Sequence, residues 1–265
     1  MEKPRDHCIR CGECCLRASP SLQVSDISHI TEGPIRRSDL YTLRAGELVR
    51  DNIWGEFKIT DQEIIKVRET ENNGGCVFYD DEGKRCIIYE QRPVQCAAMK
   101  CWDESEFLRV YAEPKANRRD LIQDNNLLRL MAAHEEKCGY ARLDLYVREI
   151  ETSGETALKK ILDLLKFDHD IRLLVPERLG IDVDDLDLIF GRPLAETIIM
   201  FGLTVVREPD GSFFLTLLNT PPNVDERGKK KPLAKAQSSQ RRPVKTAEPK
   251  KITIRNSYLN ENLEI

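Results

Sequence analysis

The sequence concentrates its chemistry in cysteine side chains close to the N-terminus. The run CIRCGECC contains four of them, at Cys8, Cys11, Cys14 and Cys15. Two-residue gaps let successive thiolates turn toward one metal, as in zinc knuckles and in the cysteine runs that hold iron–sulfur clusters. Neighbouring side chains point in different directions, so Cys14 and Cys15 are hard to place on one metal. The pattern therefore predicts two centres, or one centre with a further thiol beside it.

Four more cysteines follow before residue 102. They are Cys76, Cys86, Cys96 and Cys101. With the first four they give eight thiols, enough for two four-thiolate sites, and the sequence leaves open which cysteine joins which site. We predict all eight as metal ligands. The alternative is a set of scattered buried or disulfide-bonded cysteines, which a reducing cytoplasm disfavours.

Ligand type alone does not choose the metal, because thiolates suit zinc and iron alike. The tandem two-residue gaps with an adjacent cysteine favour an iron–sulfur cluster, of the 4Fe–4S type, over zinc. We expect Arg92 to offset thiolate charge. The ninth cysteine, Cys138, follows His134 by four residues, so both could face one metal, although a histidine that simply suits a helix terminus is the simpler interpretation.

Short elements must position the later cysteines. Val77–Tyr79 and Ile87–Tyr89 are rich in strand-forming residues and flank the turn sequence DDEG, which predicts a β-hairpin. Such a hairpin would bring Cys76 opposite Cys86. Pro93 can begin a short helix that carries the next two cysteines.

Further helices are predicted from their end signals. Two segments, Ser25–Thr31 and Ser38–Ala45, begin at a serine and end before a glycine. A longer helix is expected from Arg118 to about Glu136, with Asn117 as its N-cap.

These patterns predict an α+β protein in three parts. Residues 1–139 would form a small, irregular, metal-stapled cysteine domain with a β-hairpin and short helices. Residues 140–220 would form a mainly helical unit of unknown role that ends in a β-hairpin, an order of elements similar to a winged helix. Residues 221–265 are expected to be a basic disordered tail, because few of their side chains could build a core.

The helical unit has its own expected elements. They are a helix at Glu155–Phe167, helical segments at Asp184–Phe190 and Pro193–Phe201, and a hairpin formed by Leu203–Arg207 and Ser212–Leu218.

Charge divides along the chain. The formal net charge is −4, but residues 221–265 carry eleven lysines and arginines against five acidic residues, which leaves −10 for the rest. The tail could contact nucleic-acid phosphates or an acidic protein. Residues 177–220 hold three arginines against eight acidic residues, which argues against nucleic-acid binding by that segment.

Other classes of protein are disfavoured by what the sequence lacks. No stretch approaches the roughly 18 apolar residues of a membrane-spanning helix, and the N-terminus has no apolar secretory region. We therefore expect a cytoplasmic protein. No catalytic triad order, nucleophile elbow, phosphate loop or dinucleotide fingerprint is present, so the sequence leaves enzymatic activity undecided.

The cysteine pattern resembles that of the YkgJ-type cysteine-cluster family, described as a zinc- or iron-chelating domain. The family pattern has CxxCGxCC, a later cysteine before a strand, Cys-x-Ile-Tyr, Arg-Pro and a further cysteine. Here these elements fall on Cys8, Cys11, Gly12, Cys14, Cys15, Cys76, Cys86, Ile88, Tyr89, Arg92, Pro93 and Cys96. The resemblance covers about residues 7–101.

The same resemblance extends distantly to flagellin lysine N-methylase, which implies an iron–sulfur cluster and S-adenosylmethionine. This chain shows no Cys-x3-Cys-x2-Cys run and no glycine-rich turn for the nucleoside. We predict a metal-binding protein with a redox or protein-modifying, methylase-like role. The alternative is a non-enzymatic structural zinc module or adapter with a protein partner.

Overall fold

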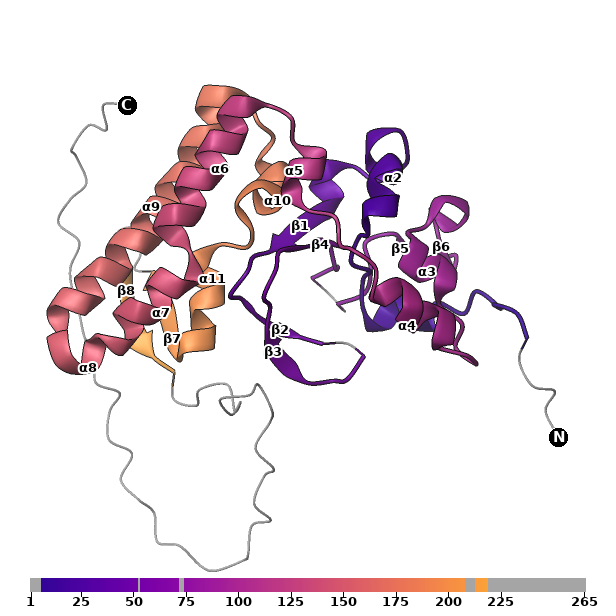
Figure 1. Cartoon of the computed structure of the whole chain (residues 1–265), viewed down its shortest axis with the longest axis horizontal. Coiled ribbons are helices and arrows are strands. Elements are labelled where there is room, and N and C mark those ends of the chain that lie inside the picture. Colours follow the sequence, from indigo (N-terminus) through magenta and orange to yellow (C-terminus); the bar gives the residue numbers. More distant parts are fainter. Residues whose placement is uncertain (1–5, 52, 72–73, 208–212, 219–265) are drawn as a thin grey trace, which may run out of the picture. The chain divides into compact units, whose positions relative to one another are not determined.

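The computed structural model describes residues 6–51, 53–71, 74–207 and 213–218 (Figure 1). The chain divides into two compact units, and neither is continuous in sequence. Unit 1 comprises residues 1–47, 60–136 and 171–192, and unit 2 comprises residues 48–59, 137–170 and 193–265. The boundary expected after residue 139 stays a prediction about independent folding. The basic tail, residues 221–265, lies outside the described residues.

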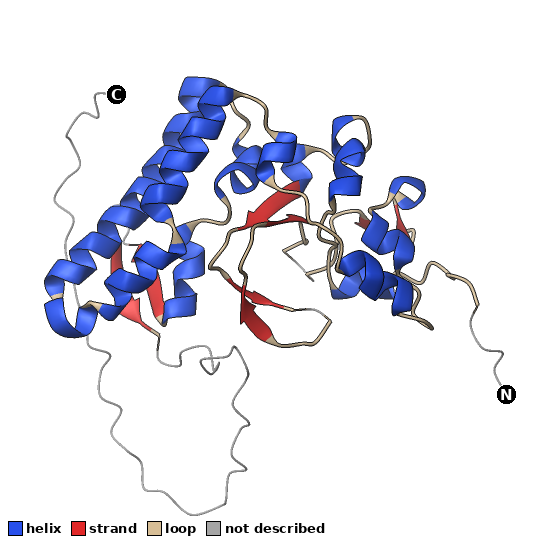
Figure 2. Cartoon of the chain, in the orientation of Figure 1, coloured by secondary structure: helices blue, strands red, loops and turns tan. Residues whose placement is uncertain are grey.

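Helices and two-stranded antiparallel sheets together build both units (Figure 2), which confirms the α+β class. The helices and 3₁₀ turns of unit 1 are α1 (Glu13–Arg17), η1 (Val24–Asp26), α2 (Ile27–Thr31), η2 (Arg37–Asp39), η3 (Tyr89–Gln91), α3 (Val94–Ala98), α4 (Ser105–Tyr111), α5 (Arg118–Leu121), η4 (Val183–Asp185) and α10 (Leu186–Phe190). Its strand pairs are β1 (Leu40–Leu43) with β4 (Ile64–Val67), and β5 (Tyr79–Asp80) with β6 (Arg85–Cys86).

Unit 2 contains two more strand pairs and a helical core. Its elements are β2 (Leu48–Arg50) with β3 (Phe57–Ile59), α7 (Tyr140–Arg148), α8 (Ile150–Ser153), α11 (Leu194–Thr197), η5 (Ile198–Phe201), and β7 (Leu203–Arg207) with β8 (Phe213–Leu217). The two longest helices, α6 (Asn125–Cys138) and α9 (Glu155–Leu179), contribute residues to both units.

The core of unit 1 joins β1 and β4 to α10, which lies far along the chain. Leu40, Ile65 and Leu188 are fully buried. The Thr42 hydroxyl, also fully buried, donates a hydrogen bond of 2.7 Å to the Leu188 carbonyl oxygen. Burial of apolar side chains from these three elements therefore stabilises unit 1 across 146 residues of sequence.

The core of unit 2 packs helices against the β7–β8 hairpin. Its buried members are Cys138, Tyr140, Leu143, Leu158, Ile161, Leu164, Leu165, Leu194, Ile198, Leu203 and Leu215. The spacing of the α9 members, at three and four residues, gives that helix one apolar face toward this core. Leu203 pairs with Leu217 at the open end of the hairpin.

Several predicted elements are confirmed. A helix covers Ile27–Thr31 after the 3₁₀ turn η1, and Pro93 precedes α3, which carries Cys96. The helix expected at residues 155–167 is present and extends to Leu179. The predicted C-terminal hairpin matches β7 and β8, although Ser212 lies outside the described residues.

The helix predicted at Ser38–Ala45 is wrong. The segment forms β1, which pairs in register with β4 from Leu40↔Val67 to Leu43↔Ile64. Leucines three residues apart fit a helix as well as a strand, and pairing with a partner more than twenty residues away decides the outcome. The helix predicted over Arg118–Glu136 is interrupted: α5 ends at Leu121, and the Asp124 carboxylate accepts from the Leu127 N–H (2.8 Å) where α6 begins.

The cysteine hairpin is present, but its predicted register is wrong. Cys86 pairs with Tyr79, whereas Cys76 lies before the hairpin and forms an isolated antiparallel β-bridge with Glu69. Cys101 lies beyond the end of α3, so the short helix holds one of the two cysteines expected on it.

Candidate metal centre

The N-terminal cysteines lie on an exposed loop that leads into α1. The Arg10 N–H donates to the Cys8 Sγ at 3.4 Å, and Arg10 has a positive φ of 56° that turns the chain between Cys8 and Cys11. Cys14 and Cys15 lie in the first turn of α1. The hydrogen bond therefore holds the Cys8 sulfur against the backbone of this loop.

Gly12 allows the loop to approach the β5–β6 hairpin. Its φ is +78°, and a Cβ built on it would lie 2.3 Å from a ring carbon of Tyr79. Any side chain at position 12 would therefore collide with the ring, while its backbone conformation already favours glycine. Tyr79 pairs with Cys86, so this contact brings the first cysteine run close to the hairpin cysteine.

A backbone hydrogen bond joins the first run to the segment before the hairpin. The Cys76 N–H donates to the Cys15 carbonyl oxygen at 2.8 Å. Cys76 is buried and Cys15 is half-buried. Two ligand candidates 61 positions apart are thus held side by side by main-chain contact.

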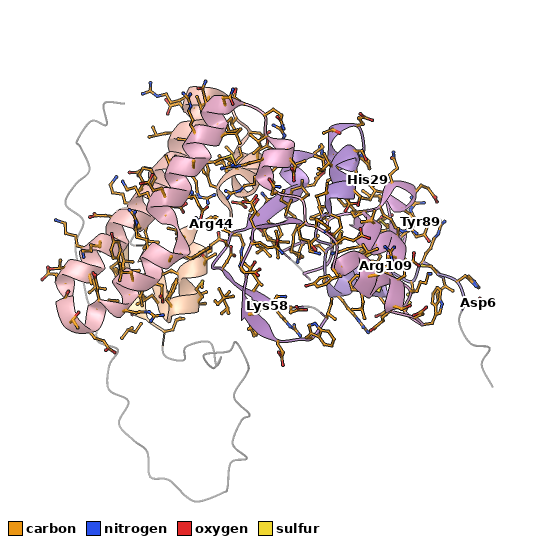
Figure 3. The ribbon with its side chains drawn as sticks, viewed as in Figure 1. Asp6, His29, Arg44, Lys58, Tyr89 and Arg109 are labelled. Carbon is orange, nitrogen blue, oxygen red and sulfur yellow. The ribbon has the colours of Figure 1, made fainter. Side chains whose placement is uncertain are left out.

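Arginines surround the aromatic ring that follows the hairpin. The Arg92 guanidinium carbon lies 3.8 Å from the centre of the Tyr89 ring, and that of Arg10 lies 3.9 Å from it. The Arg92 guanidinium also donates to the Tyr89 carbonyl oxygen, and Arg10 pairs with Glu90 at 3.4 Å (Figure 3 labels Tyr89). Cation–π contact therefore fixes two positive charges beside the cysteine segments.

Cys96 is positioned by helix α3. The Val94 N–H donates to the buried Asp26 carboxylate at 2.8 Å, and the Gln95 side chain exchanges hydrogen bonds with Ser21. These contacts tie the first turn of α3 to the segment after the N-terminal run.

Hydrogen bonding and burial set the protonation of the thiols. A hydrogen bond from the Cys15 thiol lowers the pKa of Cys14 to about 6, and the same bond, with burial, raises the pKa of Cys15 far above its usual range. Burial raises the pKa of Cys76 to about 11 and also raises the pKa values of Cys86 and Cys96. Cys14 is therefore the thiol most readily deprotonated in this group.

The same thiols act on one another through their charges. Cys14 and Cys86 raise the pKa of both Cys76 and Cys96. Arg92 lowers the pKa values of Cys14 and Cys86, after larger contributions from hydrogen bonding and burial, as expected for a cation that offsets thiolate charge. The structure thus gathers five of the eight predicted ligands, a set that we call the inner thiols: Cys14, Cys15, Cys76, Cys86 and Cys96.

The other three predicted ligands lie outside this set. Cys8, Cys11 and Cys101 are exposed. Cys11 is one of the groups that raise the pKa of Tyr79, after burial, Asp81 and Cys15. Within the part of the chain that the structure describes, no three Cys, His, Asp or Glu side chains stand ready to hold a metal ion, so closing a centre requires side-chain movement.

Cys138 and His134, which are not among the eight predicted ligands, are both fully buried. Cys138 is fully buried in the core of unit 2, with its Sγ 3.8 Å from the Leu164 carbonyl oxygen. His134, in unit 1, is fully buried with its ring centre 4.9 Å from that of Phe190.

Asp26 and Gln95 were not foreseen from the sequence, because no local pattern reveals partners about 70 residues away.

Comparison with known proteins bears on this cysteine arrangement. The sequence model of the CxxCxxCC family, described as a putative zinc- or iron-chelating domain, matches residues 7–114. After this match, we call residues 7–114 the CxxCxxCC domain. This confirms the resemblance read from the cysteine spacing, and the CxxCxxCC domain contains all eight predicted ligands. No curated protein and no solved structure matches the chain.

The donor set of the CxxCxxCC domain fits the metals named for its family. Thiol sulfurs are ligands of zinc and of iron–sulfur clusters, and the family description supports metal binding by this chain. Among the described residues, no helix combines the length and apolar character needed to cross a membrane.

Proposed function

We propose that the CxxCxxCC domain holds an iron–sulfur cluster or zinc through its eight cysteines. The inner thiols, which range from the exposed Cys14 to the buried Cys76, would supply five of the ligands. Cys8, Cys11 and Cys101 would complete the set by moving toward them. The observation that carries this proposal is the gathering of five thiols from four separate chain segments beside Arg92. Thiolates share a negative charge that a metal and a nearby guanidinium both reduce.

Between the two metals we favour an iron–sulfur cluster of the 4Fe–4S type. The support is the tandem spacing in the sequence together with more clustered thiols than one tetrahedral zinc requires. The corresponding role is redox or protein-modifying chemistry in the cytoplasm, where thiols remain reduced. A methylase-like role would add S-adenosylmethionine as a co-substrate. Because the sequence has no glycine-rich turn, we favour electron transfer over that role.

Metal analysis of protein isolated without oxygen tests this proposal. We expect a brown protein with iron and sulfide in near-equal amounts. A colourless protein that holds only zinc under these conditions would exclude the cluster, and a protein without either metal would contradict metal binding altogether.

Matched cysteine variants locate the metal. Cys86→Ser should lose bound metal, because Cys86 belongs to the inner thiols. Cys138→Ala should retain the wild-type metal content and lose about 1 kcal/mol of stability, because Cys138 fills the core of unit 2. Equal metal loss in the two variants would argue against the proposed ligand set.

A structural zinc module or adapter is the second candidate. It is favoured by the loop around Cys8 and Cys11, where the Arg10 N–H already bonds the Cys8 sulfur as in a zinc knuckle. This candidate predicts stoichiometric zinc, no redox change and loss of folded structure on chelation. A protein partner suits the adapter role, and nucleic-acid contact through the tail is a weaker proposal that rests on its sequence charge alone.

A further inference from the structure

A buried carboxylate contacts the helix that carries Cys96. The side chain of Asp26 is fully buried at the end of η1. One carboxylate oxygen accepts from the Gln23 N–H at 2.8 Å within its own turn. The other accepts from the Val94 N–H, also at 2.8 Å, across 68 residues of sequence. One side chain therefore bridges two chain segments with both of its oxygens.

The helix that donates this bond, α3, cannot fix its own orientation. Helix α3 has five residues, and its N-cap, Pro93, makes no side-chain capping bond. Helices this short are not stable alone, so their direction depends on tertiary contacts. The Asp26 carboxylate accepts from the Val94 N–H, one of the first N–H groups of the helix, which have no partner within it, two residues before Cys96.

A second buried polar contact, between Gln95 and Ser21, holds the next residue of α3. The Gln95 Oε1 accepts from the Ser21 N–H at 3.1 Å, and its Nε2 donates to the Ser21 Oγ at 2.8 Å. Gln95 is 4% exposed. Residues 94 and 95 are thus both pinned to the segment 21–26 by contacts that involve no cysteine.

His29 completes the surroundings of the carboxylate. Its Nδ1 lies 3.5 Å from the Asp26 oxygen that serves Val94, and it projects from α2 one turn beyond Asp26 (Figure 3). At this distance the ring makes no hydrogen bond to the carboxylate, so the N–H groups of Gln23 and Val94 are its direct partners.

We propose that Asp26 is a positioning residue of the metal centre, which acts by holding α3 so that the Cys96 sulfur meets the other inner thiols. This inference rests on the metal-binding function proposed above. Groups that orient ligands from outside the ligand shell typically contribute about 10–100-fold to metal affinity. Asp26→Asn preserves the shape of the side chain but puts an NH₂ group against a backbone N–H donor.

Cobalt(II) titration of the full chain tests the role of Asp26, because the sulfur-to-cobalt absorption band grows with the number of bound thiolates. In Asp26→Asn we expect cobalt affinity to fall by about 10-fold or more. The band should also weaken by about a quarter for each four-thiolate site that loses one sulfur. A lowered melting temperature alone would not change the band at saturating cobalt.

Asp39→Asn is the matched control. The Asp39 carboxylate accepts from the Arg36 N–H at 2.8 Å, three residues earlier, as the Asp26 carboxylate accepts from the Gln23 N–H. Only the Asp26 carboxylate also accepts from the Val94 N–H of α3. We expect its cobalt band and affinity to equal those of the wild-type chain. If Asp26→Asn does not fold, Gln95→Met, which removes both bonds to Ser21 at similar volume, should give the weakened band in its place.

Two results would overturn the positioning role while leaving metal binding intact. One is a wild-type band and affinity in Asp26→Asn or, where that variant does not fold, in Gln95→Met. The other is an equal weakening in Asp39→Asn. A wild-type chain that takes up no cobalt would instead overturn the metal-binding function itself, and this inference with it.

Discussion

Gly12 is a position of the candidate metal centre where a side chain does not fit. A methyl group there would lie 2.3 Å from a carbon of the Tyr79 ring, in a backbone conformation with φ of +78°. We expect Gly12→Ala to lower the free energy of unfolding of unit 1 by about 2–4 kcal/mol, from the left-handed conformation and the collision together. Urea denaturation measures this loss.

Gly180→Ala separates those two causes. Gly180 also lies in unit 1 with a positive φ, of 64°, but a Cβ there would meet nothing within 4 Å. Its alanine variant should therefore lose only the conformational part, about 1 kcal/mol. Equal losses at the two positions would show that the Tyr79 contact contributes nothing.

Residue by residue, the sequence identifies the thiols better than it identifies what holds them. Cysteine spacing is a local pattern, and the inner thiols all belong to the eight predicted ligands. The supports are Asp26, Gln95 and the Tyr79 ring, whose partners lie about 70 positions away. Buried polar residues of this kind have no periodic signal, so only the folded chain reveals them.

Among the elements, α5 shows how a short helix depends on its cap. The Asn117 side chain accepts from the Arg119 N–H at 3.0 Å, and the Asp120 carboxylate accepts from the Asn117 N–H at 2.9 Å. We expect Asn117→Ala to cost about 1 kcal/mol, because it removes this capping bond. Thermal denaturation should show a lower melting temperature than that of Asn126→Ala, a control at an exposed position of α6 where the change should stay within about 0.5 kcal/mol. Equal melting temperatures would contradict a stabilising cap.

Elements were predicted correctly where the local sequence signals agreed. The predictions were wrong where partners distant in sequence determine the secondary structure. The cap at Asn117 and the β7–β8 hairpin follow from residues close in sequence, and both are present. The segment Leu40–Leu43 carries leucines at helical spacing, yet it becomes a strand because β4 and α10 bury it. The register of the cysteine hairpin was also not predictable: Cys86 pairs with Tyr79 because the turn, residues 81–84, lies later in the chain than a pairing of Cys76 with Cys86 requires.

At the scale of the whole molecule, unit 1 depends on a segment that follows the first two segments of unit 2 in sequence. Residues 171–192 belong to unit 1, and several of their contacts reach its earlier segments. Arg118 donates to the Ile189 carbonyl oxygen at 2.8 Å, and Arg68 pairs with Asp187 at 2.9 Å. A third is the hydrogen bond from Thr42 to Leu188. The cysteine segments and this late segment are therefore parts of one structural unit.

A chain truncated after residue 139 tests that dependence. It would lose the buried side chains of Leu188, Ile189 and Phe190, each worth about 1.5–3 kcal/mol, or about 5–9 kcal/mol together. Since a domain's entire stability is about 5–15 kcal/mol, we expect the truncated chain to lack a cooperative unfolding transition in the absence of metal. A chain ending at residue 218 keeps all of the described residues and should unfold cooperatively under the same conditions. Circular dichroism during urea denaturation distinguishes the two, and a cooperative transition in the shorter chain would show that residues 1–139 fold without the later segment.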